Sequence, residues 1–138
     1  MLSYEKKIFF LNFLQNTLSE VTGITENYYR MGYHLNVSIL DDVMETFAFN
    51  LKYAKWFSSD SEWKTEMEDT KADVDLMVER IKNYLNGIGI DEIRIAKNVM
   101  NDDSNYSWIE ITAYFNLNQN VKEAIIMLDI LRGKRNAA

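Results

Sequence analysis

The sequence predicts an α+β fold in the order α-β-β-α-β-β-α, with a four-stranded, mainly antiparallel sheet packed on helices. Apolar residues recur at every third or fourth position in three segments, which is the helical period. In the segments between them they recur at every second position, which is the strand period. A short sequence pattern also occurs twice, once in each half of the chain. At 138 residues, the chain is expected to form a single domain, 1–138.

The first helix is expected at 4–22. Ser3 can accept a hydrogen bond at its start, and Gly23 is a residue type that ends helices. The apolar period then changes to two, which predicts a strand at 31–39. The acidic pair at 41–42 is typical of a turn, so a second strand can fold back on the first.

The segment 43–55 fits a helix and a strand by spacing, and its aromatic and β-branched residues slightly favour the strand. The repeated pattern decides between them, because 45–51 resembles 110–117 with one inserted residue. Each copy also follows a helix that ends in Gly-Ile, at 23–24 and at 87–88. We interpret this as an internal duplication of a helix–strand–strand unit and assign 43–55 to a strand.

The remaining elements are a long helix at 62–85 ended by Asn86-Gly87, strands at 92–99 and 106–117 joined by a turn at 101–105, and a last helix at 120–131. Gly133 is expected to end this last helix. In the strand 92–99, the alternation predicts that Ile93, Ile95 and Val99 face the helices.

Composition limits the chemistry. The chain has no cysteine and only one histidine, which excludes disulfides, thiolate zinc sites, iron–sulfur clusters and cysteine nucleophiles. We expect no metal and no cofactor. Neither a carboxylate pair in a catalytic context nor a phosphate-binding glycine loop can be recognised, so we expect a protein that is not an enzyme.

A net charge of -6 disfavours direct binding to nucleic acid or to anionic membranes. No apolar run is long enough to span a bilayer, and no signal peptide is recognisable, so a cytoplasmic location is expected.

The outward face of the second hairpin is the first candidate site. Alternate residues of its strands place aromatic and polar side chains on the side away from the helices. Tyrosine, tryptophan and arginine dominate protein-binding hot spots, so we expect a protein partner to bind here. The alternative is an ordinary solvated sheet face, since cross-strand pairs of aromatic and polar residues also stabilise sheets. The candidate residues are Trp108 and Tyr114 as anchors, with Tyr106, Arg94 and Glu110.

The first half of the long helix is the second candidate, because acidic residues crowd it. A solvated face is the simpler interpretation, since acidic residues near a helix start are favoured by its dipole. The alternative function is a DNA mimic that inhibits a nucleic-acid-binding protein. The residues of this acidic patch are Asp60, Glu62, Glu66, Glu68, Asp69 and Asp73.

The first helix is apolar on more than one side, because Phe9, Phe10 and Phe13 lie off its main stripe. A helix on the surface of a monomer needs only one apolar face. These three phenylalanines are therefore expected to form a homodimer interface.

The order of elements over most of the chain resembles that of type III secretion chaperones. Those are small acidic α+β proteins that form homodimers, although their first strand group usually has three strands where two are expected here. The resemblance implies a partner-binding protein without enzymatic activity. The expected function is thus a small acidic protein-binding module, either an adaptor, a chaperone-like protein or an inhibitor.

Overall fold

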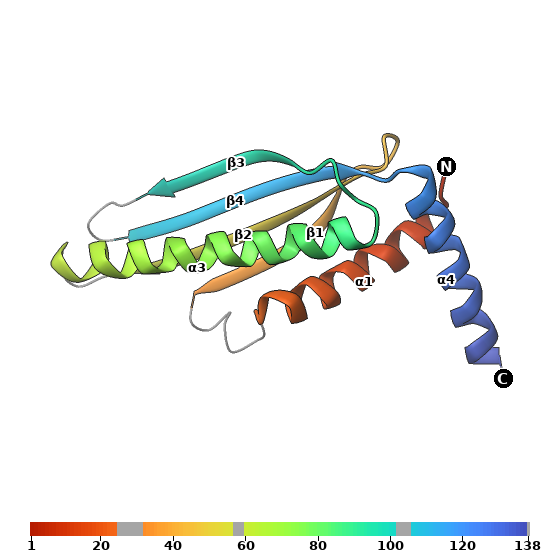
Figure 1. The fold of residues 1–138 in the computed structure, drawn as a ribbon, viewed down its shortest axis with the longest axis horizontal. Coiled ribbons are helices and arrows are strands. Elements are labelled where there is room, and N and C mark those ends of the chain that lie inside the picture. Colours follow the sequence, from red (N-terminus) through yellow and green to blue (C-terminus); the bar gives the residue numbers. More distant parts are fainter. Residues whose placement is uncertain (25–31, 57–59, 102–105, 138) are drawn as a thin grey trace.

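The computed structural model describes residues 1–24, 32–56, 60–101 and 106–137, without the side chains of 55–56, 60–65, 101, 106 and 135–137. In these residues the chain forms three helices and a four-stranded antiparallel sheet (Figure 1). The elements are α1 (Tyr4–Thr22), β1 (Tyr33–Asp41), β2 (Thr46–Trp56), α3 (Asp60–Gly87), β3 (Arg94–Asn101), β4 (Tyr106–Asn116) and α4 (Gln119–Ala137). The predicted fold class is confirmed. No helix in this part of the chain is long and apolar enough to cross a membrane.

The sheet has the order β1-β2-β4-β3, and every neighbouring pair is antiparallel. The segment that fitted both a helix and a strand is a strand from Thr46 onward, whereas 43–45 belong to the β1–β2 turn. Each hairpin contributes its second strand to the centre of the sheet, where β2 and β4 pair along their whole lengths.

The register of the central strands favours the internal duplication. Asn50 donates to Thr112 Oγ1, and Thr46 donates to the Oδ1 of Asn116, each over 2.8 Å. Thr112 and Asn116 lie 66 positions after Thr46 and Asn50, so the two Asn–Thr pairs occupy equivalent places.

The same offset corrects one detail of the expected repeat. The counterpart of Gly23-Ile24 is Gly89-Ile90 and not Gly87-Ile88. Both Gly23 and Gly89 have positive φ angles, of 73° and 96°, which favour glycine, and both isoleucines are buried.

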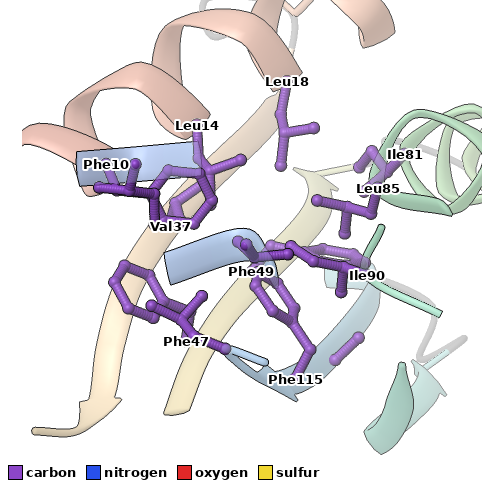
Figure 2. Close-up of a cluster of buried hydrophobic side chains, with 14 of the residues drawn as sticks. Phe10, Leu14, Leu18, Val37, Phe47, Phe49, Ile81, Leu85, Ile90 and Phe115 are labelled. Carbon is purple, nitrogen blue, oxygen red and sulfur yellow. The ribbon is translucent and has the colours of Figure 1, made fainter. Parts of the chain in front are cut away.

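Helices α1 and α3 lie side by side on one face of the sheet (Figure 1). The inward residues of the strands interdigitate with the apolar stripes of both helices, and Phe47 stacks on Phe115 with ring centroids 6.2 Å apart. Figure 2 shows the centre of this core, which includes Phe10, Leu14, Leu18, Val37, Phe47, Phe49, Ile81, Leu85, Ile90 and Phe115.

Tyr53 lies in a second buried cluster, between the sheet and α3. Its hydroxyl donates to Glu66 Oε1 over 3.3 Å. Burial and the charge of Glu66 raise the pKa of Tyr53 to about 12. The folded state therefore holds the phenol neutral at a pH where the unfolded chain ionises it.

We expect Tyr53→Phe to reduce the loss of stability at alkaline pH. An unfolded tyrosine ionises from about pH 10, so the wild type should lose stability as the pH rises from 10 through about 12. The difference between the two pKa values corresponds to a loss of at most about 2.7 kcal/mol in the free energy of unfolding. Urea denaturation of both proteins at pH 8, 10 and 11.5 measures it, and parallel stability curves would contradict the assignment.

Helix α4 leaves the end of the sheet and projects beyond α1 (Figure 1). It continues through Gly133 to Ala137, so the expected stop at Gly133 is wrong. Gly133 does not adopt a positive φ, and without that backbone turn a glycine only weakens a helix. Val121 and Ile125 are its buried apolar residues, and both lie in its first half.

Candidate functional site: the open face of the sheet

A β-bulge in β3 sets the composition of the face that the helices leave open. The register shifts between Ile95 and Lys97, so Ala96 is an extra residue and the alternation reverses beyond it. Val99 consequently pairs with Glu110 and lies on the open face. The expectation that Val99 faces the helices is wrong for this reason.

Rows of paired residues cross the open face from β1 to β3. Tyr114 and Trp108 stand in rows near its two ends, and the two rows between them carry mostly amide, hydroxyl and charged side chains. The rows are Asp41, Thr46 and Asn116; Ser38, Ala48, Tyr114 and Arg94; Asn36, Asn50, Thr112 and Lys97; His34, Lys52, Glu110 and Val99; Ala54 and Trp108.

Four of the five predicted partner-binding residues share this face. Trp108, Glu110 and Tyr114 come from alternate positions of β4 and are half-buried, and Arg94 pairs with Tyr114 and is exposed. The side chain of Tyr106 lies outside the described residues. Within the described part of the chain, the two buried clusters contain no side chain of this face.

Glu110 is held by its own chain. Its carboxylate accepts from Lys97 Nζ at 2.7 Å and from Asn50 Nδ2 at 2.9 Å, and these bonds keep the pKa of Glu110 below its ordinary value. Asn50 also donates to Thr112. Glu110 therefore orients Lys97 and Asn50 on the open face.

Two residues of this face, Lys97 and Asn50, were not predicted from the sequence. Lys97 reaches the open face through the bulge, for which the sequence carries no clear signal. Asn50 could have been found, because it alternates with Phe49 and Leu51 in a segment assigned to a strand.

The middle three rows are basic although the whole chain is acidic. They carry Lys52, Lys97 and Arg94 against one carboxylate, that of Glu110. Lys97 is half exposed even while it is paired. This face is therefore suited to acidic groups on a partner, which the net charge of the chain does not reveal.

A small hollow lies beside Tyr114 at the β3 end of the face. It has a volume of about 90 Å³ and is lined by Glu92, Arg94, Tyr114, Phe115 and Asn116. A hollow of this size can take one small side chain or a few water molecules.

The acidic patch is only partly a free acidic surface. Glu66 is half-buried and accepts from the hydroxyl of Tyr53. Glu68, Asp69 and Asp73 are exposed on α3. The side chains of the other two members, Asp60 and Glu62, lie outside the described residues.

The three phenylalanines of α1 are not all available to a second chain. Phe10 is only 3% exposed, and its ring packs edge-on against Phe47 in the core with centroids 5.5 Å apart. Phe10 is thus unavailable to a second chain, because the sheet already covers it. Phe9 and Phe13 are half-buried and line an apolar groove of about 370 Å³ between α1 and α4, together with Leu128, Leu131 and Arg132.

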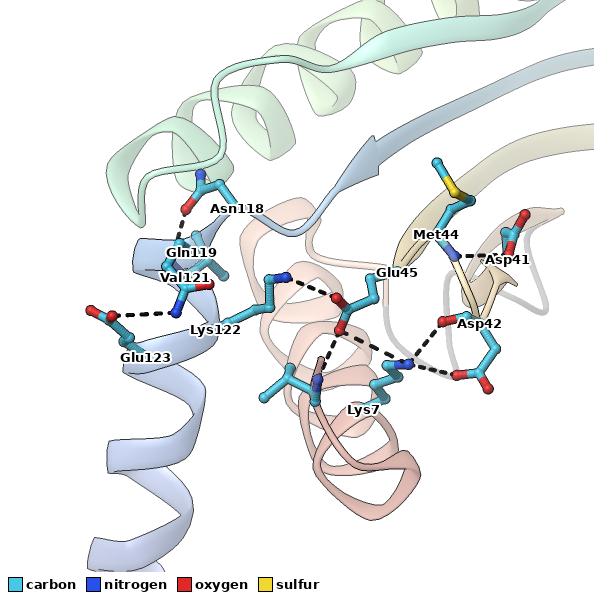
Figure 3. Close-up of polar contacts among 11 residues, drawn as sticks. Lys7, Asp41, Asp42, Met44, Glu45, Asn118, Gln119, Val121, Lys122 and Glu123 are labelled. Atoms are coloured by element: carbon cyan, nitrogen blue, oxygen red, sulfur yellow. Dashed lines mark hydrogen bonds and ion pairs between the residues drawn. The ribbon is translucent and has the colours of Figure 1, made fainter.

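A buried polar cluster joins the β1–β2 turn to the starts of α1 and α4 (Figure 3). Glu45 accepts from Lys122 Nζ at 2.8 Å and from the backbone N–H of Leu2 at 3.0 Å. Lys7, 1% exposed, donates to the backbone oxygen and to Oδ1 of Asp42, both at 2.8 Å, and lies 3.9 Å from Glu45. These pairs fix α4 against α1.

Glu45 also has a positive φ of 54°, unusual for a residue with a side chain. Burial alone would raise the pKa of Glu45, but its bonds to Lys122 and Leu2 and the charges of Lys122 and Lys7 outweigh burial and lower it. The carboxylate of Glu45 is therefore ionised at neutral pH and lies between two lysines of opposite charge, which is the arrangement of a structural support.

Among the described residues, no three histidine, aspartate or glutamate side chains are gathered so that they could hold a metal ion. No family model, no curated protein and no solved structure matches the chain, so the open face is interpreted from its own geometry.

Proposed function

We propose that the protein is a small, non-enzymatic protein-binding module, acting as an adaptor, a chaperone-like protein or an inhibitor, and that it holds its partner on the open face of the sheet. One observation carries the proposal. Trp108 and Tyr114 stand six residues apart, about 20 Å at the rise of a strand, on a face that none of the described helices covers. Half-buried aromatic side chains held by a rigid sheet are typical anchors for a partner.

The chemistry around the anchors indicates the partner. Lys97, Arg94 and Lys52 favour a protein segment with acidic side chains, while the aromatic rings favour apolar side chains at its two ends. In this proposal the module is a homodimer, and Phe9 and Phe13 rather than Phe10 belong to the self-association surface.

We expect Trp108→Ala and Tyr114→Ala each to weaken partner binding by about 2 kcal/mol or more, which is about 30-fold in Kd. A partner captured from a lysate of the native host is identified, purified and titrated by calorimetry. The chain should stay folded, because the apolar face of β4 is left intact. Tyr4→Ala is the matched control, since Tyr4 is an exposed aromatic residue on α1.

The same titration tests the alternative function, a DNA mimic that acts through the acidic patch of α3. Reversal of Asp69 and Asp73 to lysine changes the exposed part of the acidic patch and leaves the Tyr53–Glu66 bond intact. If this double variant abolishes binding while Trp108→Ala has no effect, the acidic helix carries the function and the open face does not.

A further inference from the structure

Helix α4 carries apolar side chains on most of its circumference. Between Ile126 and Leu131 five of these side chains are 38–57% exposed, although they are among the most apolar in the chain. A helix that is apolar on nearly every side requires cover from another element or another molecule. The exposed residues are Ile126, Met127, Leu128, Ile130 and Leu131.

One stripe along this surface has charged residues at its two ends and apolar residues between them. Glu123, Met127, Ile130 and Lys134 follow one another at spacings of four, three and four, so they share one face of the helix. All four are exposed, with opposite charges at the two ends and apolar residues between them.

This stripe is complementary to the same stripe of a second copy that runs in the opposite direction. If two copies of α4 pack antiparallel about an axis between residues 128 and 129, Met127 lies opposite Ile130 of the second copy. Glu123 then lies opposite Lys134 of the second copy, at both ends of the contact. Parallel packing would instead place Glu123 against Glu123 and Lys134 against Lys134, which repel.

We propose that a second copy of this chain covers α4 through antiparallel pairing of the stripe formed by Glu123, Met127, Ile130 and Lys134. The inference rests on the proposed homodimer and specifies its surface and register. The groove lined by Phe9 and Phe13 continues the contact, because Leu131 belongs both to the groove and to the exposed apolar surface of α4. The open face of the sheet is left free by this arrangement.

The first test is the oligomeric state, measured by sedimentation velocity from 1 to 100 μM. The wild type should sediment as a dimer of the 16.2 kDa chain, and Ile130→Glu should raise the dimer dissociation constant by about 100-fold or more. Leu76→Glu is the matched control, since Leu76 is an equally exposed apolar residue on α3 and should leave the dimer unchanged. A wild type that stays monomeric at 100 μM overturns the proposal, as does an Ile130→Glu variant as dimeric as the wild type.

The second test is the register, and the lack of cysteine gives it a clean background. A Glu123→Cys chain mixed with a Lys134→Cys chain should form a disulfide-linked heterodimer under mild oxidation. Lys134→Cys alone should not crosslink, because antiparallel packing separates its two copies by eleven residues, about 16 Å along the helix. Crosslinking of Lys134→Cys alone, or none in the mixture, overturns the antiparallel register.

Neither measurement involves the partner of the open face. A protein that dimerises as described but whose partner binding is insensitive to Trp108→Ala contradicts the proposed function alone. A protein that binds through Trp108 but stays monomeric contradicts the proposed homodimer and its α4 pairing, and leaves the binding site on the open face standing.

Discussion

Phe49→Ala is expected to lower the free energy of unfolding by about 3–5 kcal/mol. Phe49 is fully buried on the central strand β2, between Val37 of β1 and Ala113 of β4, and it faces both helices. Because Ala113 is small, the ring of Phe49 fills space that β4 does not fill, and its removal leaves a cavity in a closed part of the core. Urea denaturation at 25 °C measures the change.

The control is Met44→Ala in the turn of the same hairpin. Met44 is 62% exposed, so its truncation should change stability by less than about 0.5 kcal/mol. A cost below about 1 kcal/mol for Phe49→Ala would mean that the core can close around the missing ring, and that β2 is not the rigid centre of the sheet.

Glu45→Gln is expected to cost about 2–3 kcal/mol at neutral pH. The substitution keeps the shape and the positive φ of the residue but removes the carboxylate that pairs with Lys122 and neutralises Lys7. Lys122 thereby loses its carboxylate partner, and the buried Lys7 keeps Asp42 but loses the second carboxylate near it, which is costly in the protein interior. Glu79→Gln, an exposed change on α3, should stay within about 0.5 kcal/mol.

The same pair of proteins gives a pH dependence with a defined sign. The pKa of Glu45 is lower in the folded state than its ordinary 4.5, so its contribution is complete above about pH 4.5 and is lost as the pH falls through the lowered value. The stability gap between wild type and Glu45→Gln should therefore narrow below pH 4.5. A gap that stays constant from pH 7 to pH 3 would show that Glu45 acts through its shape and not its charge.

The order of elements could be predicted from the sequence because periodicity and capping residues are local. Ser3 and Gly23 bound α1 as expected, since Ser3 Oγ accepts from the backbone N–H of Lys6 and Gly23 adopts a positive φ. The repeated pattern correctly selected a strand from Thr46 onward. Gly133 was wrongly expected to end α4, because a glycine ends a helix only where the backbone also turns.

The candidate site was predicted in part, for a physical reason. Trp108, Glu110 and Tyr114 share a face because β4 is regular, and alternation is then sufficient. Val99 and Lys97 were misplaced or missed because an extra residue reverses the alternation, and nothing in the composition of β3 marks that residue. Phe10 was assigned to an interface because helical spacing cannot tell which neighbour covers an apolar side.

The bulge at Ala96 has a consequence for how the protein behaves at high concentration. β3 is an edge strand whose side chains from 94 to 100 are all exposed, and a regular edge of this kind can pair with the edge of another molecule and start aggregation. The bulge breaks the even spacing of its backbone donors and acceptors, and charged side chains, Arg94 and Lys97, flank it. The residue that brings Lys97 to the open face thus also hinders the open-ended growth of β-sheet from this edge.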